Sequence, residues 1–264
     1  MGWLGVDGRC ALVGMVHLRP LPGSPGWSGS MAEVVEAAAR DAEALAEGGC
    51  DALIVENMGD VPYLRGSVPP ETVAAAAVAA ARVAAVGLPF GVQLLAGANL
   101  EALGVAVATG ARFVRVEAFA YAHIADEGLL QASAGPLLRA RRALGADVSI
   151  WADVQKKHAA HTLTADLDLG ELARGHLFCG ADALIVTGVA TGRPVVVDDV
   201  ARARVGAPVA VGSGVDAASA GALSALADAL IVGTALKVGG DWRAPVDVTR
   251  VRAVRAAVDA AGRG

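Results

Sequence analysis

Two apolar runs near the end of the sequence lead directly into glycine-containing turns. The first reads Pro-Val-Ala-Val-Gly-Ser-Gly-Val over residues 208–215, and the second reads Asp-Ala-Leu-Ile-Val-Gly-Thr-Ala-Leu-Lys over residues 228–237. A short β-strand that ends in such a turn, before the start of a helix, presents free backbone N–H groups and a positive helix end to an anion. We therefore predict a phosphate site formed by Gly212, Ser213, Gly214, Gly233, Thr234 and Lys237.

Each of these turns also has a simpler interpretation. Glycine is favoured wherever the backbone needs a positive φ, so one turn of this kind is weak evidence for a ligand. Lys237 either decorates the helix that follows or adds a charge to the phosphate site. Two such turns on the last two strands of an α/β chain are, however, the arrangement in which (β/α)8 barrels hold phosphate.

Polar and ionisable residues follow the apolar runs elsewhere in the chain. Side chains at such positions could act as general acids, general bases or nucleophiles, or could bind a substrate. A carboxylate that ends an apolar run is either paired or faces a cavity, and both situations shift its pKa. The predicted catalytic residues are His17, Glu56, Asp153, Lys157 and His158. The predicted substrate-binding residues are Asn57, Gln93, Arg115, Glu117 and Thr187.

For several of these residues a structural role is the alternative. His17 could be a packing histidine, and Arg115 is expected in a buried ion pair with Glu117 or Asp153 unless it clamps an anionic substrate. Lys156 is expected to be a solvated loop residue. A Schiff-base lysine is conceivable, but such lysines prefer a desolvated strand position, and the chain has no inward-facing strand lysine.

No cofactor is firmly implied by the sequence. His17, Glu56 and Asp153 offer the nitrogen and oxygen atoms that a divalent metal ion prefers. No tight spacing such as His-Glu-x-x-His accompanies them, so the predicted site includes no metal. The three cysteines are scattered without a Cys-x-x-Cys pair, which indicates neither a disulfide framework nor a structural zinc site.

Eight short apolar runs are expected to be the strands that bring these residues together. Six of them cover residues 11–16, 51–56, 89–95, 111–117, 148–153 and 182–187, and the other two precede the glycine turns. The helical patterns between them cover about residues 31–47 with Ser30 as the cap, stretches that begin at Pro70 and near Asn99, a stretch from Asp126 or Glu127 to about 144, and about 167–179, 197–205 and 248–261.

Strands that alternate with helices imply a parallel sheet. Eight such units in 264 residues favour one domain over residues 1–264, folded as a (β/α)8 TIM barrel. A doubly wound sheet is the competing α/β fold. In a barrel the active site lies at the carboxyl ends of the strands, so the residues that follow the apolar runs should converge there.

The composition narrows the range of partners. The net charge of −5, without any basic block, argues against a nucleic-acid polymer. The very apolar stretch 73–86 is interrupted by Arg82 and is too short to span a bilayer, and no signal peptide is seen. We expect a cytoplasmic protein, with a homodimer as the default assembly.

Motifs spread over about residues 12–250 resemble the BtpA family. They include Gly-Met-Val-His-Leu-Arg-Pro-Leu-Pro-Gly-Ser-Pro at 14–25, Ile-Val-Glu-Asn-Met-Gly-Asp at 54–60, Ala-Asp-Val-Gln-Lys-Lys-His-Ala at 152–159, Thr-Gly at 191–192, and both glycine turns. The resemblance implies a TIM-barrel enzyme, and the family's name also implies a factor for photosystem I biogenesis.

The chain departs from the family pattern at the mouth of the expected barrel. The resemblance implies Asn on the third strand followed by Arg-Asn-Asp, whereas these places carry Gln93 and Ala-Gly-Ala at 96–98. It also implies Asn where this chain has Glu117. These differences indicate a changed substrate at that end of the site, while the phosphate end is intact.

The sequence therefore predicts an enzyme that acts on a small phosphorylated metabolite, either a sugar phosphate or a nucleotide-like compound. General acid–base chemistry by His17, Glu56 and Asp153 would serve isomerisation, lyase chemistry or changes at a glycosidic bond. The residues do not choose among these reactions. The alternatives are a non-catalytic assembly or stability factor for a membrane complex, and a sensor of phosphorylated ligands.

Overall fold

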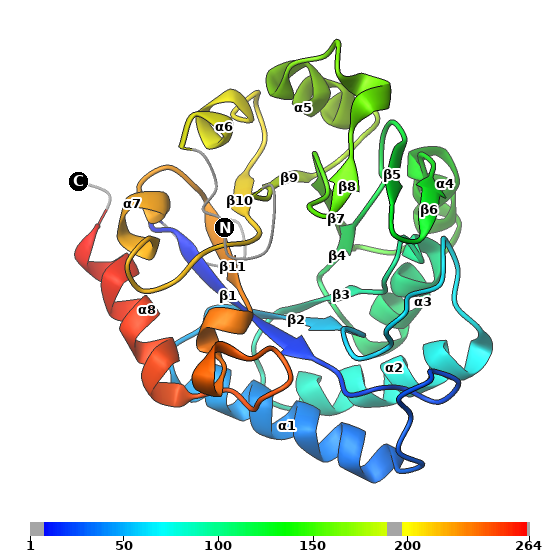
Figure 1. The fold of residues 1–264 in the computed structure, drawn as a ribbon, viewed down its shortest axis with the longest axis vertical. Coiled ribbons are helices and arrows are strands. Elements are labelled where there is room, and N and C mark those ends of the chain that lie inside the picture. Colours follow the sequence, from blue (N-terminus) through cyan, green and yellow to red (C-terminus); the bar gives the residue numbers. More distant parts are fainter. Residues whose placement is uncertain (1–7, 189–196, 263–264) are drawn as a thin grey trace.

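The closure of the strands into a barrel defines the architecture (Figure 1). The computed structural model describes residues 8–188 and 197–262. The barrel strands are β1 (Ala11–His17), β2 (Ala52–Glu56), β3 (Phe90–Gln93), β4 (Phe113–Val116), β7 (Ser149–Asp153), β9 (Ala183–Val186), β10 (Val209–Val211) and β11 (Ala229–Val232). The predicted (β/α)8 barrel is confirmed. The doubly wound alternative is wrong, because β1 pairs in parallel with both β2 and β11.

Helices lie around the outside of the strands (Figure 1). Ser30 caps the first of them as predicted, because its hydroxyl oxygen accepts a hydrogen bond from the Glu33 N–H. The helices are α1 (Met31–Glu47), α2 (Pro70–Ala84), α3 (Asn99–Thr109), α4 (Ala134–Ala143), α5 (Leu169–Phe178), α6 (Val197–Arg202), α7 (Ala220–Ser224) and α8 (Val248–Ala260), with the short 3-10 turns η2 (Thr162–Thr164), η3 (Thr234–Leu236) and η4 (Val238–Gly240). The face that they turn to the strands is an apolar layer rich in Ala, Val and Leu.

A small antiparallel sheet replaces the helix start that was predicted at Asp126 or Glu127. Strands β5 (His123–Ala125) and β6 (Gly128–Leu130) form a hairpin, and β8 (Ala159–Ala160) pairs with β5. Ala125 pairs with Gly128, so Asp126 and Glu127 form a two-residue turn. Gly128 has a φ of 101°, which a helix does not allow. The acidic pair that suggested a helix N-terminus is therefore the tip of a hairpin.

The interior of the barrel is filled by every second residue of the strands, as the pleat requires. The rings of Phe113 and Trp151 stack there with their centroids 3.8 Å apart. Gly91 supplies the space for this stack, since a Cβ at that position would lie 2.3 Å from the Phe113 ring. The other buried residues of this inner cluster are Ala11, Val13, Met15, Ala52, Ile54, Ala183, Ile185, Ala210, Ala229 and Ile231. Together they form a solid floor below the carboxyl ends of the strands.

The contact between Gly91 and Phe113 leads to a prediction about stability. The substitution Gly91→Ala should lower the free energy of unfolding by about 1–3 kcal/mol, because the core must shift to accept the methyl group. The control is Gly104→Ala on the exposed face of α3, where an added Cβ meets nothing within 4 Å. That change should raise the free energy of unfolding by up to about 1 kcal/mol through helix propensity. Equal urea midpoints for the two variants would contradict the described packing.

Candidate active site

A cavity of about 940 Å³ opens at the carboxyl ends of the barrel strands. Its walls come from strand ends and from the loops that follow them. Most of the residues predicted from the sequence line it. These are His17, Glu56, Gln93, Arg115, Glu117, Asp153, Lys157, His158, Gly212, Ser213, Gly214, Gly233 and Thr234.

The strand register explains why these residues converge. Across β1, β2 and β3, His17 pairs with Glu56 and Glu56 pairs with Gln93. Each lies two positions beyond an inward-facing strand residue, so each side chain also points inward. On β10 and β11 the corresponding inward positions are Gly212 and Gly233. One side of the cavity therefore carries polar and ionisable side chains, and the other side exposes backbone.

Gly212 and Gly233 leave space in the cavity that a side chain at either position would occupy. A Cβ on Gly212 would lie 2.6 Å from Ile185, and a Cβ on Gly233 would lie 3.0 Å from the His17 ring. Gly214 has a φ of 70°, which favours glycine. Within the described residues, the backbone N–H groups of Gly214, Val215, Thr234 and Ala235 have no hydrogen-bond acceptor. They are available to a ligand.

Two arginines that the sequence reasoning missed lie beside these turns. Arg243 and Arg250 line the cavity, and Arg250 Nη1 donates a hydrogen bond to the Ala235 carbonyl oxygen at 3.3 Å. The Arg243 guanidinium lies 4.4 Å from the centre of the Trp242 ring. Both arginines lie several residues after the last strand, and no sequence motif there indicates a role in the site. They bring positive charge to the glycine side of the cavity.

Lys237 lies elsewhere than the phosphate prediction required. Its side chain is fully buried, forms an ion pair with Asp41 of α1, and does not line the cavity. Asp41 also accepts a hydrogen bond from the Val246 N–H at 2.9 Å. The chain turns outward after η3, which carries Lys237 to the helix layer rather than to the cavity.

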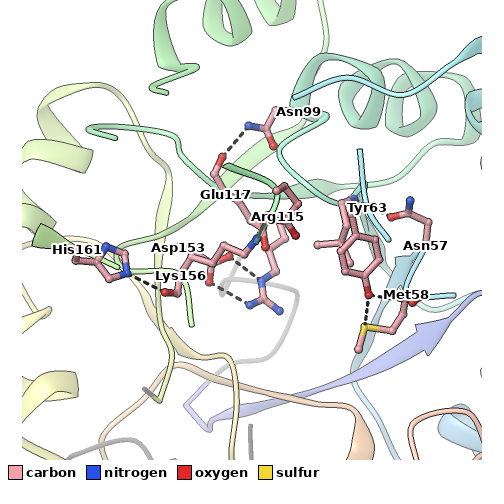
Figure 2. Close-up of polar contacts among 11 residues, drawn as sticks. Asn57, Met58, Tyr63, Asn99, Arg115, Glu117, Asp153, Lys156 and His161 are labelled. Carbon is pink, nitrogen blue, oxygen red and sulfur yellow. Dashed lines mark hydrogen bonds and ion pairs between the residues drawn. The ribbon is translucent and has the colours of Figure 1, made fainter. Parts of the chain in front are cut away.

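Arg115 and Asp153 form a buried, two-pronged ion pair (Figure 2). Arg115 Nε lies 3.0 Å from Asp153 Oδ2, and Nη2 lies 3.1 Å from Oδ1. The ion pair that was favoured for Arg115 is thus present, with Asp153 as its partner. Because the guanidinium occupies both carboxylate oxygens, Asp153 is a weaker candidate for a general base than the sequence suggested.

The Lys156 side chain is only 10% exposed and lies between two glutamates, so the expectation of a solvated lysine is wrong. Its Nζ lies 3.3 Å from Glu117 Oε2 on the barrel wall and 3.1 Å from Glu127 Oε2 at the hairpin tip. Burial raises the pKa of Glu117 to about 7, although Lys156 opposes this change. The hairpin that sequence reasoning missed thus supplies one of the two partners that bury this lysine.

His17 and Glu56 form a close pair on adjacent strands. His17 Nε2 lies 3.5 Å from Glu56 Oε2, and both side chains are nearly inaccessible to solvent. Burial, followed by the charge of Lys237, lowers the pKa of His17 to about 3. Burial also raises the pKa of Glu56, against the charges of Arg115 and Lys157. A neutral imidazole therefore lies beside a carboxyl group that resists ionisation, an arrangement suited to proton transfer.

Two predicted substrate-binding residues are used inside the protein instead. Asn57 accepts a hydrogen bond from the Leu95 N–H at 2.7 Å and donates to Asp60 at 3.0 Å. Thr187 donates its hydroxyl to the Gln155 carbonyl oxygen at 2.7 Å. Neither lines the cavity. The Thr-Gly pair at 191–192 lies outside the described residues.

Other features of the cavity were not predicted from the sequence. Met58 and Tyr63 lie on the wall near β2 (Figure 2), and Tyr63 donates its hydroxyl to the Met58 carbonyl oxygen at 3.0 Å. Trp242 packs edge-on against the His17 ring with a centroid distance of 6.4 Å. In the ranges 8–188 and 197–262, no three His, Cys, Asp or Glu side chains gather to hold a metal ion. Over the same ranges, no helix combines the length and apolarity needed to cross a bilayer.

The raised pKa of Glu117 leads to a prediction about pH. The folded protein keeps a proton that the unfolded chain releases between about pH 4.5 and 7, so stability falls as the pH rises through that window. Glu117→Gln removes this titration. The variant's free energy of unfolding should rise relative to wild type across the window, by up to about 3 kcal/mol. Urea unfolding at several pH values measures it, with Glu36→Gln on the exposed face of α1 as the control. If the free energy of unfolding depends on pH in the same way for Glu117→Gln and wild type, the raised pKa of Glu117 is refuted.

Solved structures share the fold of this chain. Tryptophan synthase of Mycobacterium tuberculosis aligns with a TM-score of 0.60 and 19% identity, over 97% of this chain and 94% of that one. Phosphoribosylanthranilate isomerase of Pyrococcus furiosus aligns with a TM-score of 0.56 and 13% identity, over 95% and 99% of the two chains. A 3-hexulose-6-phosphate synthase aligns with a TM-score of 0.56 and 18% identity, over 94% and 99%. These likenesses support the TIM-barrel fold.

Relatives in sequence are much closer. An uncharacterised protein of Thermococcus kodakarensis is 40% identical, over 92% of this chain and 93% of its own length. The photosystem I biogenesis protein BtpA of Synechocystis is 38% identical, over 92% and 85%. An uncharacterised mitochondrial protein of Caenorhabditis elegans is 37% identical, over 92% and 91%. The family model described as the BtpA family matches residues 9–260. The chain therefore belongs to the BtpA family.

Proposed function

We propose that this protein is an enzyme that acts on a small phosphorylated metabolite inside the barrel. The observation that supports this most is the division of the cavity at its inward-facing strand positions. Glycine occupies these positions on β10 and β11, while titratable side chains occupy them on β1, β2, β4 and β7. One wall suits an anion, and the facing wall suits proton transfer.

The phosphate would bind on the glycine side. The N–H groups of residues 214–215 and 234–235, which have no acceptor among the described residues, are donors for its oxygens, and Arg243 and Arg250 add positive charge. Binding energy from this end would hold the reactive end of the substrate against the other wall. Arg243 and Arg250 take the place that the sequence prediction gave to Lys237.

Proton transfer would fall to the buried pair His17 and Glu56, with Glu117 as a second carboxyl group. Their shifted pKa values are those of groups that exchange protons rather than bind as fixed charges. Arg115 and Asp153 neutralise each other and would position the substrate by hydrogen bonds. Isomerisation, lyase chemistry and reactions at a glycosidic bond are all compatible with this set.

The comparison with solved structures agrees with a phosphorylated sugar or nucleotide-like substrate. Two of the enzymes that share the fold, the phosphoribosylanthranilate isomerase and the hexulose-6-phosphate synthase, carry a phosphorylated sugar in their names. Their identity to this chain is below 20%, so the substrate proposal depends on the cavity rather than on them.

A role in assembly is the second candidate. The observation that favours it is the name of the Synechocystis relative, a photosystem I biogenesis protein at 38% identity. An assembly factor has no physical need for buried, pKa-shifted side chains around a cavity. The two candidate functions predict different results when the Glu56 carboxylate is removed. An enzyme would lose turnover, whereas an assembly factor would keep its activity.

The phosphate end is tested by adding a negative charge to the turn after β11. Thr234→Asp should weaken binding of inorganic phosphate and of ribose 5-phosphate at least tenfold, because the carboxylate repels the ligand at close range. Ala253→Asp, on the exposed face of α8, adds the same charge to the outer surface and should leave binding unchanged. Thermal shift and calorimetric titration measure both. If no phosphorylated ligand stabilises the wild-type protein, the proposal fails.

The two buried carboxylates should respond differently to replacement by an amide. Glu56→Gln should keep the fold and lower turnover on the true substrate at least a hundredfold, because a proton-transfer group is lost. Asp153→Asn should lower the free energy of unfolding by about 3–5 kcal/mol, because it leaves the buried Arg115 charge unpaired. Melting curves and turnover measured on both variants separate the two roles. A Glu56→Gln variant with full turnover would exclude Glu56 from the chemistry.

A further inference from the structure

Lysine is unusually rare in this chain, and its positions are informative. The sequence contains 22 lysines and arginines, of which only Lys156, Lys157 and Lys237 are lysines. Exposed cationic positions carry arginine throughout, whereas none of the three lysines is exposed. The properties that only lysine offers are a compact ammonium group and an amine that can lose its proton.

Two of the three lysines have evident structural partners. Lys156 lies between Glu117 and Glu127, and Lys237 pairs with Asp41. Lys157 differs from both. Within the described residues it forms no hydrogen bond and no ion pair, although its side chain lines the cavity. The neighbouring Arg115 forms an ion pair with Asp153. Lys157 therefore differs from Arg115 in having no ionic partner within the described residues.

The surroundings of Lys157 make its amine easier to deprotonate than that of a free lysine. Burial lowers its pKa, and the charge of Arg115 lowers it further, against the opposing carboxylates Glu56, Asp153 and Glu117. These groups lie on or directly after β2, β4 and β7, and His17 of β1 also interacts with the charge of Lys157. An amine that lines a cavity, forms no ion pair within the described residues and holds its proton less tightly than a free lysine has the surroundings of a nucleophilic lysine.

We propose that Lys157 is the nucleophilic amine of this cavity and forms an imine with an aldehyde or ketone group of the substrate. This inference deepens the proposed function. It rests on that function for the orientation of the substrate, whose phosphate would lie on the glycine turns. The sequence argued against such a lysine because none was expected on a strand. In the structure, the loop directly after β7 delivers the side chain into the cavity instead.

The chemistry balances with groups that the cavity holds. The Nζ lone pair attacks the carbonyl carbon, whose oxygen takes a proton from a carboxylic acid such as Glu56, and Nζ releases a proton to a carboxylate. The resulting carbinolamine takes up a second proton on its hydroxyl and loses water as the C=N bond forms. The net change is amine plus carbonyl to imine plus water, with no change of oxidation state.

An imine would narrow the class of reaction. A protonated C=N group withdraws electrons from the adjacent carbon, so that carbon can lose a proton or break a bond to its neighbour. The substrate class is thus a phosphorylated aldehyde or ketone, and the reaction is lyase or isomerase chemistry beside the carbonyl. A change confined to a glycosidic bond would not need Lys157.

Reductive trapping tests the proposal on the intact protein. Wild-type protein is incubated near neutral pH with glyceraldehyde 3-phosphate and sodium cyanoborohydride, which reduces an imine to a stable amine. Peptide mass mapping then locates the adduct. Lys157 should be labelled at least tenfold faster than Lys156, Lys237 or the amino terminus, and the preference should vanish in urea. Equal labelling of the lysines, or no label on Lys157, would overturn the proposal.

Variants and a competitor complete the test. Lys157→Arg should lose the preferred adduct, whereas Lys156→Arg, which can keep both glutamate contacts, should retain it. Glycerol 3-phosphate carries the phosphate but no carbonyl group. If it raises the melting temperature while Lys157 stays unlabelled, the imine fails and the phosphate site stands. If Lys157 is labelled and glycerol 3-phosphate neither protects it nor stabilises the protein, the imine stands and the phosphate site fails.

Discussion

Side chains alternate between two faces along each strand of a closed barrel, and this alternation determines where chemistry can occur. Every second residue points inward, and the floor of the barrel is filled up to the level of Phe113 and Trp151. The next inward positions have no apolar layer above them. They carry His17, Glu56, Gln93 and Asp153 on one side and glycines on the other. The alternation of side chains therefore places both the apolar residues of the core and the polar residues of the cavity.

Charge compensation then decides which of these side chains remain reactive. The Arg115 guanidinium takes both oxygens of Asp153, and Lys156 joins Glu117 to Glu127, so these groups largely satisfy one another. Among the described residues, Lys157 has no ionic partner, and His17 and Glu56 face each other at 3.5 Å. Burial disfavours the charged form of each group, so it lowers the pKa values of His17 and Lys157 and raises that of Glu56.

The strands and their inward positions were predictable because the apolar runs are short, regular and separated by clear turn signals. The helices between them were also largely predictable, but the segment after β4 was not. Asp126 and Glu127 read as a helix start because acidic residues favour helix N-termini, yet Gly128 makes them the turn of a hairpin. The burial of Lys156 depends on that hairpin, so it was missed together with it. Lys237 was predicted at the glycine turns but pairs with Asp41 instead, and Arg250, for which the sequence predicted no role, lines the cavity, because η3 turns the chain outward in a way that no local pattern reveals.

The two ends of the cavity differ in how much they can change. The glycine end exposes backbone, and a Cβ at Gly212 or Gly233 would lie 2.6 Å from Ile185 or 3.0 Å from the His17 ring, so few substitutions are possible there. The opposite end consists of side chains on β4 and on the hairpin tip, and these can be exchanged without altering the barrel. Glu117 illustrates the consequence. A carboxylate at this depth needs a counter-charge, which Lys156 provides, and Lys156 in turn draws in Glu127. A single substitution at this position would therefore change the charge of the cavity wall, its titration and the support of the hairpin together, while the glycine turns stay as they are.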